Sequence, residues 1–359
     1  MNAASRTELT VGFMPLLDCA LLVVAHEAGL ARQQGLSLRL VRETSWANIR
    51  DRLAVGHFDA AHMLGPMVIA QNLGIGLLDT PLVAPVALGT GGNAITVSRP
   101  LWSAMRAAGA AIGAEPAQQA RALSDVVARR RAAGQPVLTL AMVYPFSCHN
   151  YQLRDWLGAG GVDPDRDVRL VVLPPPLLVD ALRSGQVDGF CVGEPWNSLA
   201  VEAGIGVMPV VCSDLWPRQP EKVLGLRAQL AEENAEAVGA LVRSIHAASL
   251  WASDPANHAD LASLLSQPRY VGAPARLLHS ALAGDLRVDA QEPPIRRPEF
   301  ASFGPDDINP RESHAEMLIT HMQRCGQLPA GRAAADGFHS GYRADLFQGA
   351  LASIAGRSK

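Results

Sequence analysis

The sequence is poor in the features that mark nucleic-acid-binding proteins. Aromatic residues make up 5% of its 359 residues, and no run of Lys and Arg stands out. Binding to DNA or RNA uses a clustered basic surface, often with aromatic side chains on which bases stack. Direct binding of nucleic acid is therefore not expected. The net charge of −3 is too small to identify another partner.

Cysteines are few, and they form no motif. The five cysteines are widely spaced, their number is odd, and no CxxC pair occurs; they are Cys19, Cys148, Cys191, Cys212 and Cys325. This pattern supports neither a disulfide framework nor a structural zinc site. Scattered thiols with apolar neighbours fit a reducing compartment. We therefore expect no metal and no other cofactor.

Long apolar runs are also missing. The stretch "LLDCALLVVA" at residues 16–25 is interrupted by Asp18. Its length of about 10 residues is too short to cross a bilayer. One weak positive charge precedes it and no A-x-A-like site follows, so it does not fit a secretory leader. These features predict a buried helix and a cytoplasmic protein that is not associated with a membrane.

What the sequence does contain is an alternation of strand and helix patterns. Strand-like segments at 8–14, 36–43 and 58–64 alternate with helical spacing at 18–35 and 45–57. Such an order predicts a mostly parallel sheet with helices on its faces. The alternation restarts near residue 93, with strand-like segments at 93–98, 136–145 and 168–176.

Two stretches share one template, which indicates two similar α/β lobes. "IRDRLAVGHFDAAHMLGP" (49–66) and "LVDALRSGQVDGFCVGEP" (178–195) both read as apolar helix, Gly, Asp and apolar strand. We expect residues 1–92 plus 222–359 to form the first lobe and residues 93–221 the second. The irregular tail should wrap the first lobe. Open α/β sheets bind ligands beyond the carboxyl ends of their strands, which predicts a ligand cleft between the lobes.

Several polar residues fall at the predicted strand ends and at the crossing between lobes. They are Trp46, His62, Asn93, His149 and Glu194. Each has a structural alternative: Trp46 could be core packing, His62 a buried histidine with local partners, Asn93 a turn residue after two glycines, His149 a helix-start residue near Asp155, and Glu194 a brace of its lobe.

Long segments of the chain resemble a known family. "SWANIRDRLAVGHFDAAHMLGPM", "CHNYQLRDWLGAGGVDPDRDVRLVVLPPP", "VDGFCVGEPWN" and "EKVLGLR" resemble the NrtA/CmpA-type nitrate- and bicarbonate-binding proteins, over about residues 9–325. The resemblance implies a two-lobed periplasmic-binding-protein-like α/β fold (type II, cluster-D-like), a ligand clamped between lobes, and no catalysis. It also implies ligand contacts for Trp46, His149 and Lys222. Asn93 stands where nitrate binders have Gln, so its contact is less well defined.

Within this family the sequence resembles the NasS-type cytoplasmic nitrate/nitrite sensors. That resemblance implies that the protein holds a NasT-like ANTAR-type antiterminator and releases it when nitrate or nitrite binds, which induces nitrate assimilation genes. The alternative is the solute-binding component of an ABC transporter for nitrate, bicarbonate or a related anion. The two functions share a ligand and differ in compartment and partner.

The candidate residues suit the chemistry of nitrate, which is planar, monovalent and a weak hydrogen-bond acceptor. A site for it needs N–H donors, one positive charge, and no carboxylate facing the ligand. Trp46, Asn93 and His149 supply donors, and Lys222 supplies the cation. Bicarbonate would need an acceptor for its own O–H, and only Glu194 in this set provides one. Lys222 therefore favours nitrate, since the resemblance implies an acidic residue there in bicarbonate binders.

An enzyme is the remote alternative. Cys148 and His149 could suggest a nucleophile and its base, and thiamine-precursor synthases of a related fold use His and Cys. Neighbouring residues at a helix start point their side chains apart, however, so they do not readily form such a pair. No zinc-protease motif and no Gly-rich phosphate loop occurs. We expect no enzymatic activity.

Overall fold

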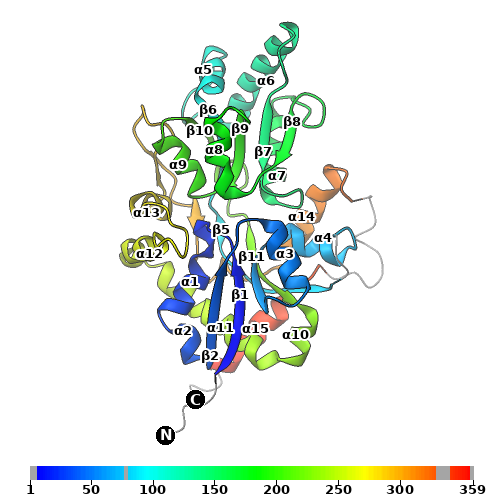
Figure 1. The fold of residues 1–359 in the computed structure, drawn as a ribbon, viewed down its shortest axis with the longest axis vertical. Helices are drawn as coiled ribbons and strands as arrows, with labels where there is room; N and C mark the ends of the chain where they lie inside the picture. The colour runs from blue at the N-terminus through cyan, green and yellow to red at the C-terminus, as the bar shows by residue number, and fades with distance from the viewer. Residues whose placement is uncertain (1–5, 77–79, 329–339, 356–359) are drawn as a thin grey trace. The chain divides into compact units, whose positions relative to one another are not determined.

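The computed structural model describes residues 6–76, 80–328 and 340–355. The chain divides into two compact units, each with its own sheet (Figure 1). Unit 1 comprises Met1–Thr90, Pro220–Gly272 and Ser302–Lys359, and unit 2 comprises Gly91–Gln219 and Ala273–Ala301.

The sheet of unit 1 has five strands in the order β2-β1-β3-β11-β4. Their bounds are Thr7–Phe13 (β1), Leu36–Arg42 (β2), Ala60–Leu64 (β3), Leu82–Ala87 (β4) and Lys222–Arg227 (β11). Strand β1 is parallel to β2 and β3, whereas β11 is antiparallel to β3 and β4. All residues of β3 and β4 are buried, which fits their continuous apolar sequences.

The sheet of unit 2 has the same topology. Its order is β8-β7-β9-β6-β10, with bounds Asn93–Ser98 (β6), Thr139–Met142 (β7), Arg169–Val172 (β8), Gly189–Gly193 (β9) and Gly206–Val211 (β10). In unit 1, β1 lies between β2 and β3, and β4 pairs with β11, the strand that follows a chain crossing. In unit 2, β7 lies between β8 and β9, and β10 pairs with β6, which also follows a chain crossing. The two similar lobes predicted from the shared template are confirmed.

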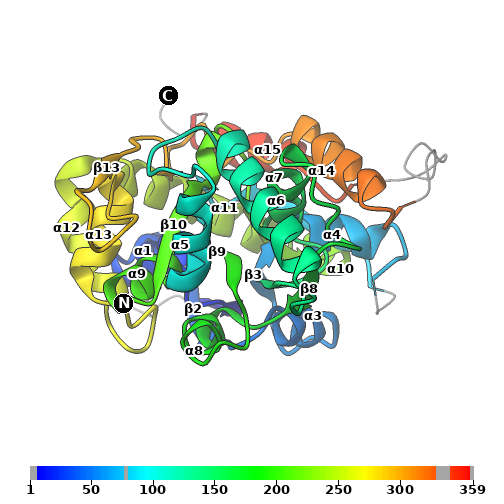
Figure 2. The same cartoon turned by 90° about the horizontal axis from the view of Figure 1, so that it is seen from above.

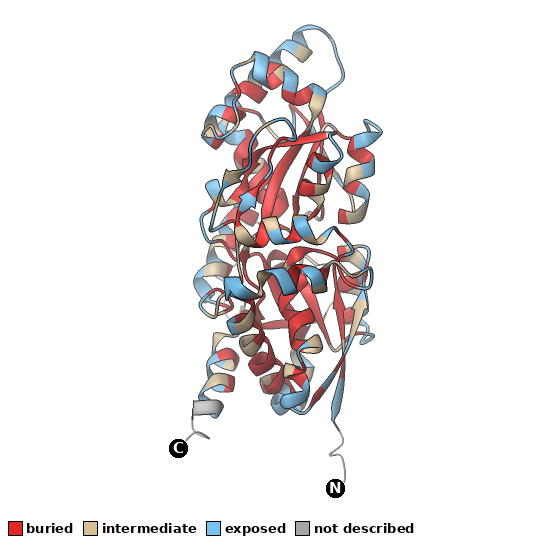
Figure 3. Cartoon of the chain, turned by 90° about the vertical axis from the view of Figure 1, so that its left-hand side faces the viewer, coloured by how far each residue is buried: buried red, intermediate tan, exposed pale blue. Residues whose placement is uncertain are grey.

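Helices cover both sheets. Unit 1 contains α1 (Ala20–Glu27), α2 (Leu30–Gln33), α3 (Trp46–Ala54), α4 (Gly65–Asn72), α10 (Ala228–Glu233), α11 (Ala235–Ala252), α12 (His258–Leu265), α14 (Glu312–Arg324) and α15 (Ala344–Ala355). Unit 2 contains α5 (Arg99–Ala107), α6 (Pro116–Ala132), α7 (Cys148–Ala159), α8 (Leu178–Arg183), α9 (Trp196–Glu202) and α13 (Ala275–Ala283). Most strands of the two sheets are buried, while β8 and the outward faces of the helices are partly or fully exposed (Figure 3).

The prediction of mostly parallel sheets was only partly right, because one strand is reversed in each unit. Strand β6 is antiparallel to β9 and β10, and β11 is antiparallel to β3 and β4. Each of these strands is the first after the chain crosses from the other unit. No helix of the same unit carries the chain into it, so the rule that makes β-α-β connections parallel does not apply.

The predicted division was wrong for residues 273–301, which belong to unit 2 rather than to the first lobe. Two contacts bind this segment there. The Met208 N–H donates to the Val288 carbonyl at 2.8 Å, and Arg99 pairs with the buried Asp289 at 2.6 Å. The tail is also less irregular than expected, since α14 and α15 form in unit 1.

A close approach of two helices in unit 2 gives the first testable prediction. Helices α6 and α7 pack side by side (Figure 2), and a Cβ added at Gly160 would lie 2.3 Å from the Ala120 carbonyl oxygen. Gly160→Ala should therefore lower the free energy of unfolding by about 1–3 kcal/mol. Gly158→Ala is the matched control: it lies in α7 with no neighbour within 4 Å, and Ala there should be neutral or stabilising. Urea unfolding that left Gly160→Ala as stable as Gly158→Ala would contradict this packing.

Candidate functional site

In unit 1, polar side chains from four parts of the chain meet at the ends of the strands. Asp18 follows β1, Trp46 begins α3 after β2, His62 lies on β3, and Lys222 begins β11 after Glu221. We refer to these five residues as the unit-1 cluster. Parallel strands place their carboxyl ends at one edge of a sheet, which brings residues distant in sequence together.

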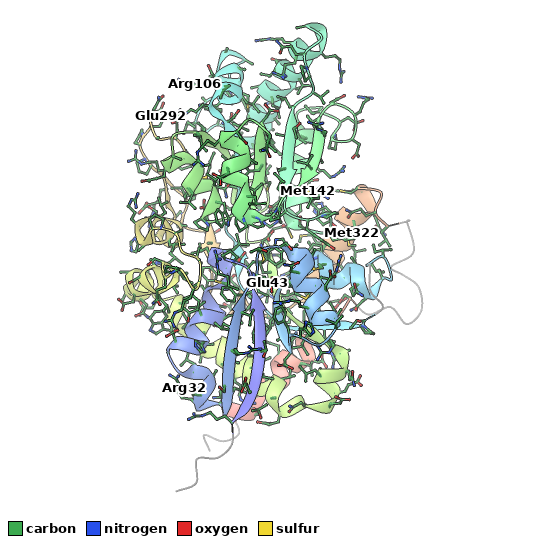
Figure 4. The ribbon with its side chains drawn as sticks, viewed as in Figure 1. Arg32, Glu43, Arg106, Met142, Glu292 and Met322 are labelled. Atoms are coloured by element: carbon green, nitrogen blue, oxygen red, sulfur yellow. The ribbon has the colours of Figure 1, made fainter. Side chains whose placement is uncertain are left out.

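The position of Trp46 is fixed by the start of α3. The Ser45 hydroxyl caps the helix by accepting the Asn48 N–H at 3.2 Å. Glu43, buried at the end of β2 and labelled in Figure 4, accepts from the Asn48 side chain at 3.1 Å and pairs with Arg52. These bonds anchor the first turns of α3 to β2. Trp46 is 1% exposed as a result.

Lys222 is fully buried between two carboxylates. Its Nζ lies 2.9 Å from Asp18 Oδ2 and also contacts Glu221 Oε2. Burial alone would lower the pKa of Lys222, but Asp18 and Glu221 outweigh it and raise the pKa. Burial raises the pKa of Asp18, and its interactions with Lys222 and His62 lower it by more. Lys222 and Asp18 are therefore both charged at neutral pH.

His62 is a buried histidine with local partners. Its Nδ1 accepts the Met14 N–H at 3.4 Å, and its Nε2 lies 3.1 Å from Asp18 Oδ1. An Nδ1 that accepts leaves the proton on Nε2, which faces the carboxylate. The Trp46 ring packs edge-on against His62, with centroids 5.3 Å apart. His62 thus orients Asp18 and Trp46, which is the structural alternative considered for it.

The N–H groups of Trp46 and Lys222 are not all paired within the described residues. Trp46 Nε1 is buried and has no hydrogen-bond partner in the described part of the chain. The Lys222 ammonium has three N–H groups, and Asp18 and Glu221 are the two acceptors it meets among the described residues. Its Nζ lies 5.9 Å from the centroid of the Trp46 ring. Buried donors without partners are costly, so this arrangement suits a ligand that accepts hydrogen bonds.

Two carboxylates lie beside the predicted site residue Lys222. Sequence reasoning placed Lys222 in the site but missed Asp18 and Glu221. Two carboxylates, those of Asp18 and Glu221, thus contact the single ammonium of Lys222. Two signals in the sequence point to such pairing: Asp18 interrupts an apolar run, and Lys222 is one of two lysines in the chain, preceded directly by Glu221.

The buried pair of Asp18 and Lys222 predicts that the free energy of unfolding depends on pH. The pKa of Asp18 is lower in the folded protein than in the unfolded chain, so its contribution is complete above about pH 4 and is lost as the pH falls. Asp18→Asn should lower the free energy of unfolding at neutral pH by roughly 3 kcal/mol, since it removes one partner of a buried pair. Its stability should then fall less than that of the wild type on acidification. Urea melts at several pH values test this; parallel pH profiles would contradict it.

In unit 2, Asn93, His149 and Glu194 lie at the ends of neighbouring strands. Strands β7 and β9 are parallel; His149 is the second residue of α7 after β7, and Glu194 follows β9 directly. Asn93 begins β6 opposite Gly193, the last residue of β9. All three side chains are buried. The structure therefore brings these three predicted residues to one edge of the unit-2 sheet.

The Asn93 amide is engaged within unit 2. Its Nδ2 donates to Gln152 Oε1 at 2.9 Å, and the Cys191 thiol lies 4.0 Å from the same oxygen. Gln152, one turn after His149 on α7, was not predicted as part of the site. The Ser147 hydroxyl caps α7, accepting the Asn150 N–H at 3.1 Å. Asn93 is thus held in place by α7.

The structure offers no support for the metal or membrane alternatives within its described residues. No group of three or more His, Cys, Asp or Glu side chains in residues 6–76, 80–328 and 340–355 could hold a metal ion. None of the helices in those ranges combines the length and apolarity that a bilayer crossing requires. Cys148 and His149 are consecutive residues in the first turn of α7, buried within unit 2.

Comparison with known proteins places the chain in a family. Residues 2–266 match the NMT1-like family. The nitrate/nitrite binding protein NrtA of Synechococcus elongatus is 32% identical over 361 residues, covering 96% of this chain and 78% of NrtA. The nitrate import ATP-binding protein NrtC of Synechocystis is 34% identical over 332 residues, covering 91% of this chain but 47% of NrtC. The chain thus spans about half the length of NrtC.

Solved structures agree with this assignment. The periplasmic nitrate-binding protein NrtA of Synechocystis superposes with a TM-score of 0.87 at 26% identity, covering 98% of this chain and 90% of NrtA. The alkanesulfonate-binding protein SsuA of Xanthomonas axonopodis shares the fold alone, with a TM-score of 0.62 at 17% identity, covering 97% of this chain and 99% of SsuA. The predicted two-lobed α/β fold class is confirmed. The chain belongs to the NMT1-like family and, within it, to the NrtA-type proteins that its sequence resembles.

Proposed function

We propose that this chain binds nitrate or nitrite and serves as the solute-binding component of an anion import system, without enzymatic activity. The observation that carries the proposal lies in the unit-1 cluster: the buried Trp46 indole N–H has no acceptor among the described residues, and the Lys222 ammonium lies near the Trp46 ring. Nitrate and nitrite accept hydrogen bonds and donate none, so they fit these groups. The names of the NrtA relatives support the same ligands.

The charge of the unit-1 cluster supports a monovalent ligand over a divalent one. The single ammonium of Lys222 already pairs with the ionised Asp18 and contacts the Glu221 carboxyl group, so a second negative charge on the ligand would meet repulsion at low local dielectric. A planar anion with one charge is still attracted by the Lys222 ammonium and is repelled less by the two carboxyl groups. We therefore propose that sulfate is rejected, although its oxygens are good acceptors.

Titration calorimetry tests the ligand. Nitrate and nitrite are expected to bind with low-micromolar Kd or tighter, about −8 kcal/mol or more favourable. Sulfate at the same concentration should give no heat of binding and should not compete with nitrate. Absence of binding by both nitrate and nitrite would overturn the proposed function.

A second proposal keeps the regulatory function implied by the NasS resemblance. In it the protein is cytoplasmic and holds a NasT-like ANTAR-type regulator until nitrate or nitrite binds. Affinity capture from a soluble extract separates the two proposals. Recovery of an ANTAR-domain protein that is lost on adding nitrate would support the sensor, whereas recovery of permease components alone would support transport.

A further inference from the structure

Glu194 has a buried carboxyl group in which one of the two oxygens accepts no hydrogen bond from the described residues. The residue is 1% exposed, and its Oε2 accepts the backbone N–H of Ser198 at 3.2 Å. Its Oε1 is buried without a hydrogen-bond partner in the described part of the chain. A buried polar atom of this kind requires an explanation, and a ligand group is one.

The backbone holds Glu194 beside another predicted ligand residue. The Glu194 N–H donates to the Gly92 carbonyl at 2.9 Å, next to Asn93, which pairs with Gly193 across β6 and β9. Helix α7, which contributes His149 and Gln152, packs against β9. The unpartnered oxygen thus belongs to the same sheet edge as the Asn93 amide and the start of α7.

The Glu194 carboxyl group lies apart from the cations of the described residues. Among the described residues, no Arg, Lys or His lies within ion-pair distance of its carboxyl group, unlike Asp18 in unit 1. The titratable side chains on the elements packed around it are Cys148, His149, Tyr151, Arg154 and Asp155 on α7, Cys191 on β9, Asp180 and Arg183 on α8, and Glu202 on α9. Burial raises the pKa of Glu194 to about 7, with the Ser198 N–H opposing the rise. Both protonation states are therefore populated near neutral pH.

We propose that Glu194 contacts an anion at the unit-2 sheet edge in its protonated form, donating its O–H to an oxygen of that anion, so that anion binding takes up a proton. This proposal rests on the proposed function. An ionised Glu194 would place a negative charge beside the anion. The neutral acid instead donates an O–H to nitrate or nitrite, which have acceptor oxygens and no donor of their own. The proton comes from solvent and returns there when the anion leaves.

The Glu194 carboxyl group would distinguish anions without an O–H, such as nitrate and nitrite, from bicarbonate. Bicarbonate carries an O–H, which an ionised Glu194 can accept. Bicarbonate would thus favour the ionised form, and its binding would release a proton or leave protonation unchanged. Glu194 is in this sense a specificity-determining residue for the proposed ligand.

Calorimetry of the wild-type protein measures the proton directly. Nitrate titrations at about pH 8, in two buffers of different ionisation enthalpy, should show uptake approaching one proton. The affinity should fall by up to tenfold per pH unit above about pH 7. Equal affinity at about pH 6 and pH 8 with no proton uptake would overturn this role of Glu194 while leaving anion binding intact. No nitrate binding at either pH would instead overturn the proposed function.

Two variants assign the proton to Glu194. Glu194→Gln, which donates at every pH, should bind nitrate more tightly than the wild type at about pH 8, with affinity independent of pH and no proton uptake. Glu194→Ala should bind more weakly than the wild type at about pH 6 and also lose the pH dependence. Glu202→Gln, on α9 and exposed, is the matched control and should keep the wild-type profile. Proton uptake that persists in Glu194→Gln would assign it to another group and overturn the proposal.

Discussion

Lys222→Met is expected to abolish measurable nitrate binding and to lower the free energy of unfolding by about 3–5 kcal/mol. The substitution keeps an unbranched side chain of similar length and removes the ammonium that pairs with Asp18 and Glu221. Two carboxylates would then share a buried space without a cation. Urea unfolding and calorimetry, measured on the same preparation, give the two effects.

A triple variant separates the effect of Lys222 on stability from its effect on nitrate binding. Adding Asp18→Asn and Glu221→Gln to Lys222→Met removes the uncompensated charges, so most of the lost stability should return. Nitrate binding should not return, because the ammonium donor is still missing. Recovery of wild-type binding by the triple variant, or wild-type binding by Lys222→Met alone, would show that Lys222 is structural and not part of the anion site.

Substitutions of Trp46 should have the second largest effects, and Trp46→Ala and Trp46→Phe should differ in how they change stability. Trp46→Ala should cost about 3–5 kcal/mol of stability, since it leaves a cavity beside His62 and Lys222. Trp46→Phe keeps most of the ring and removes only the N–H. Because that N–H has no acceptor among the described residues, the stability of the free protein should stay the same or rise slightly. Nitrate affinity should nonetheless fall by 1–3 kcal/mol, roughly five- to 150-fold.

Trp156→Phe is the matched control. Trp156 is as buried as Trp46, but its Nε1 donates to the Pro116 carbonyl at 3.1 Å. Removing this N–H should lower stability by about 1–3 kcal/mol and leave nitrate binding unchanged. The opposite pattern, with Trp46→Phe destabilised and its binding intact, would identify the Trp46 N–H as part of the folded core.

The sequence predicted the parts of this protein that depend on local pattern. Alternating strands and helices, and the template shared by residues 49–66 and 178–195, were sufficient to predict two similar lobes. Trp46 stood out because it begins a helix directly after a strand. The contacts of Lys222 could not be predicted in this way. Its partner Asp18 lies about 200 positions earlier in the sequence, and no local pattern relates the two.

The error over residues 273–301 has a related cause. The segment follows helices of unit 1 and was assigned by its place in the chain, whereas its position depends on contacts with distant residues such as Arg99 and Met208. The reversed strands β6 and β11 were missed for the same reason, because strand direction depends on where the chain crosses between units.

The central claim, that the Trp46 indole N–H and the Lys222 ammonium bind a monovalent oxyanion, is tested most directly by nuclear magnetic resonance. The sequence has six Trp residues, so a ¹⁵N–¹H spectrum should resolve six indole signals at most, and the one missing in Trp46→Phe identifies Trp46. We predict that this signal shifts saturably with nitrate and not with sulfate, and that it stops responding in Lys222→Met. Nitrate binding that leaves the Trp46 signal unmoved would contradict the claim.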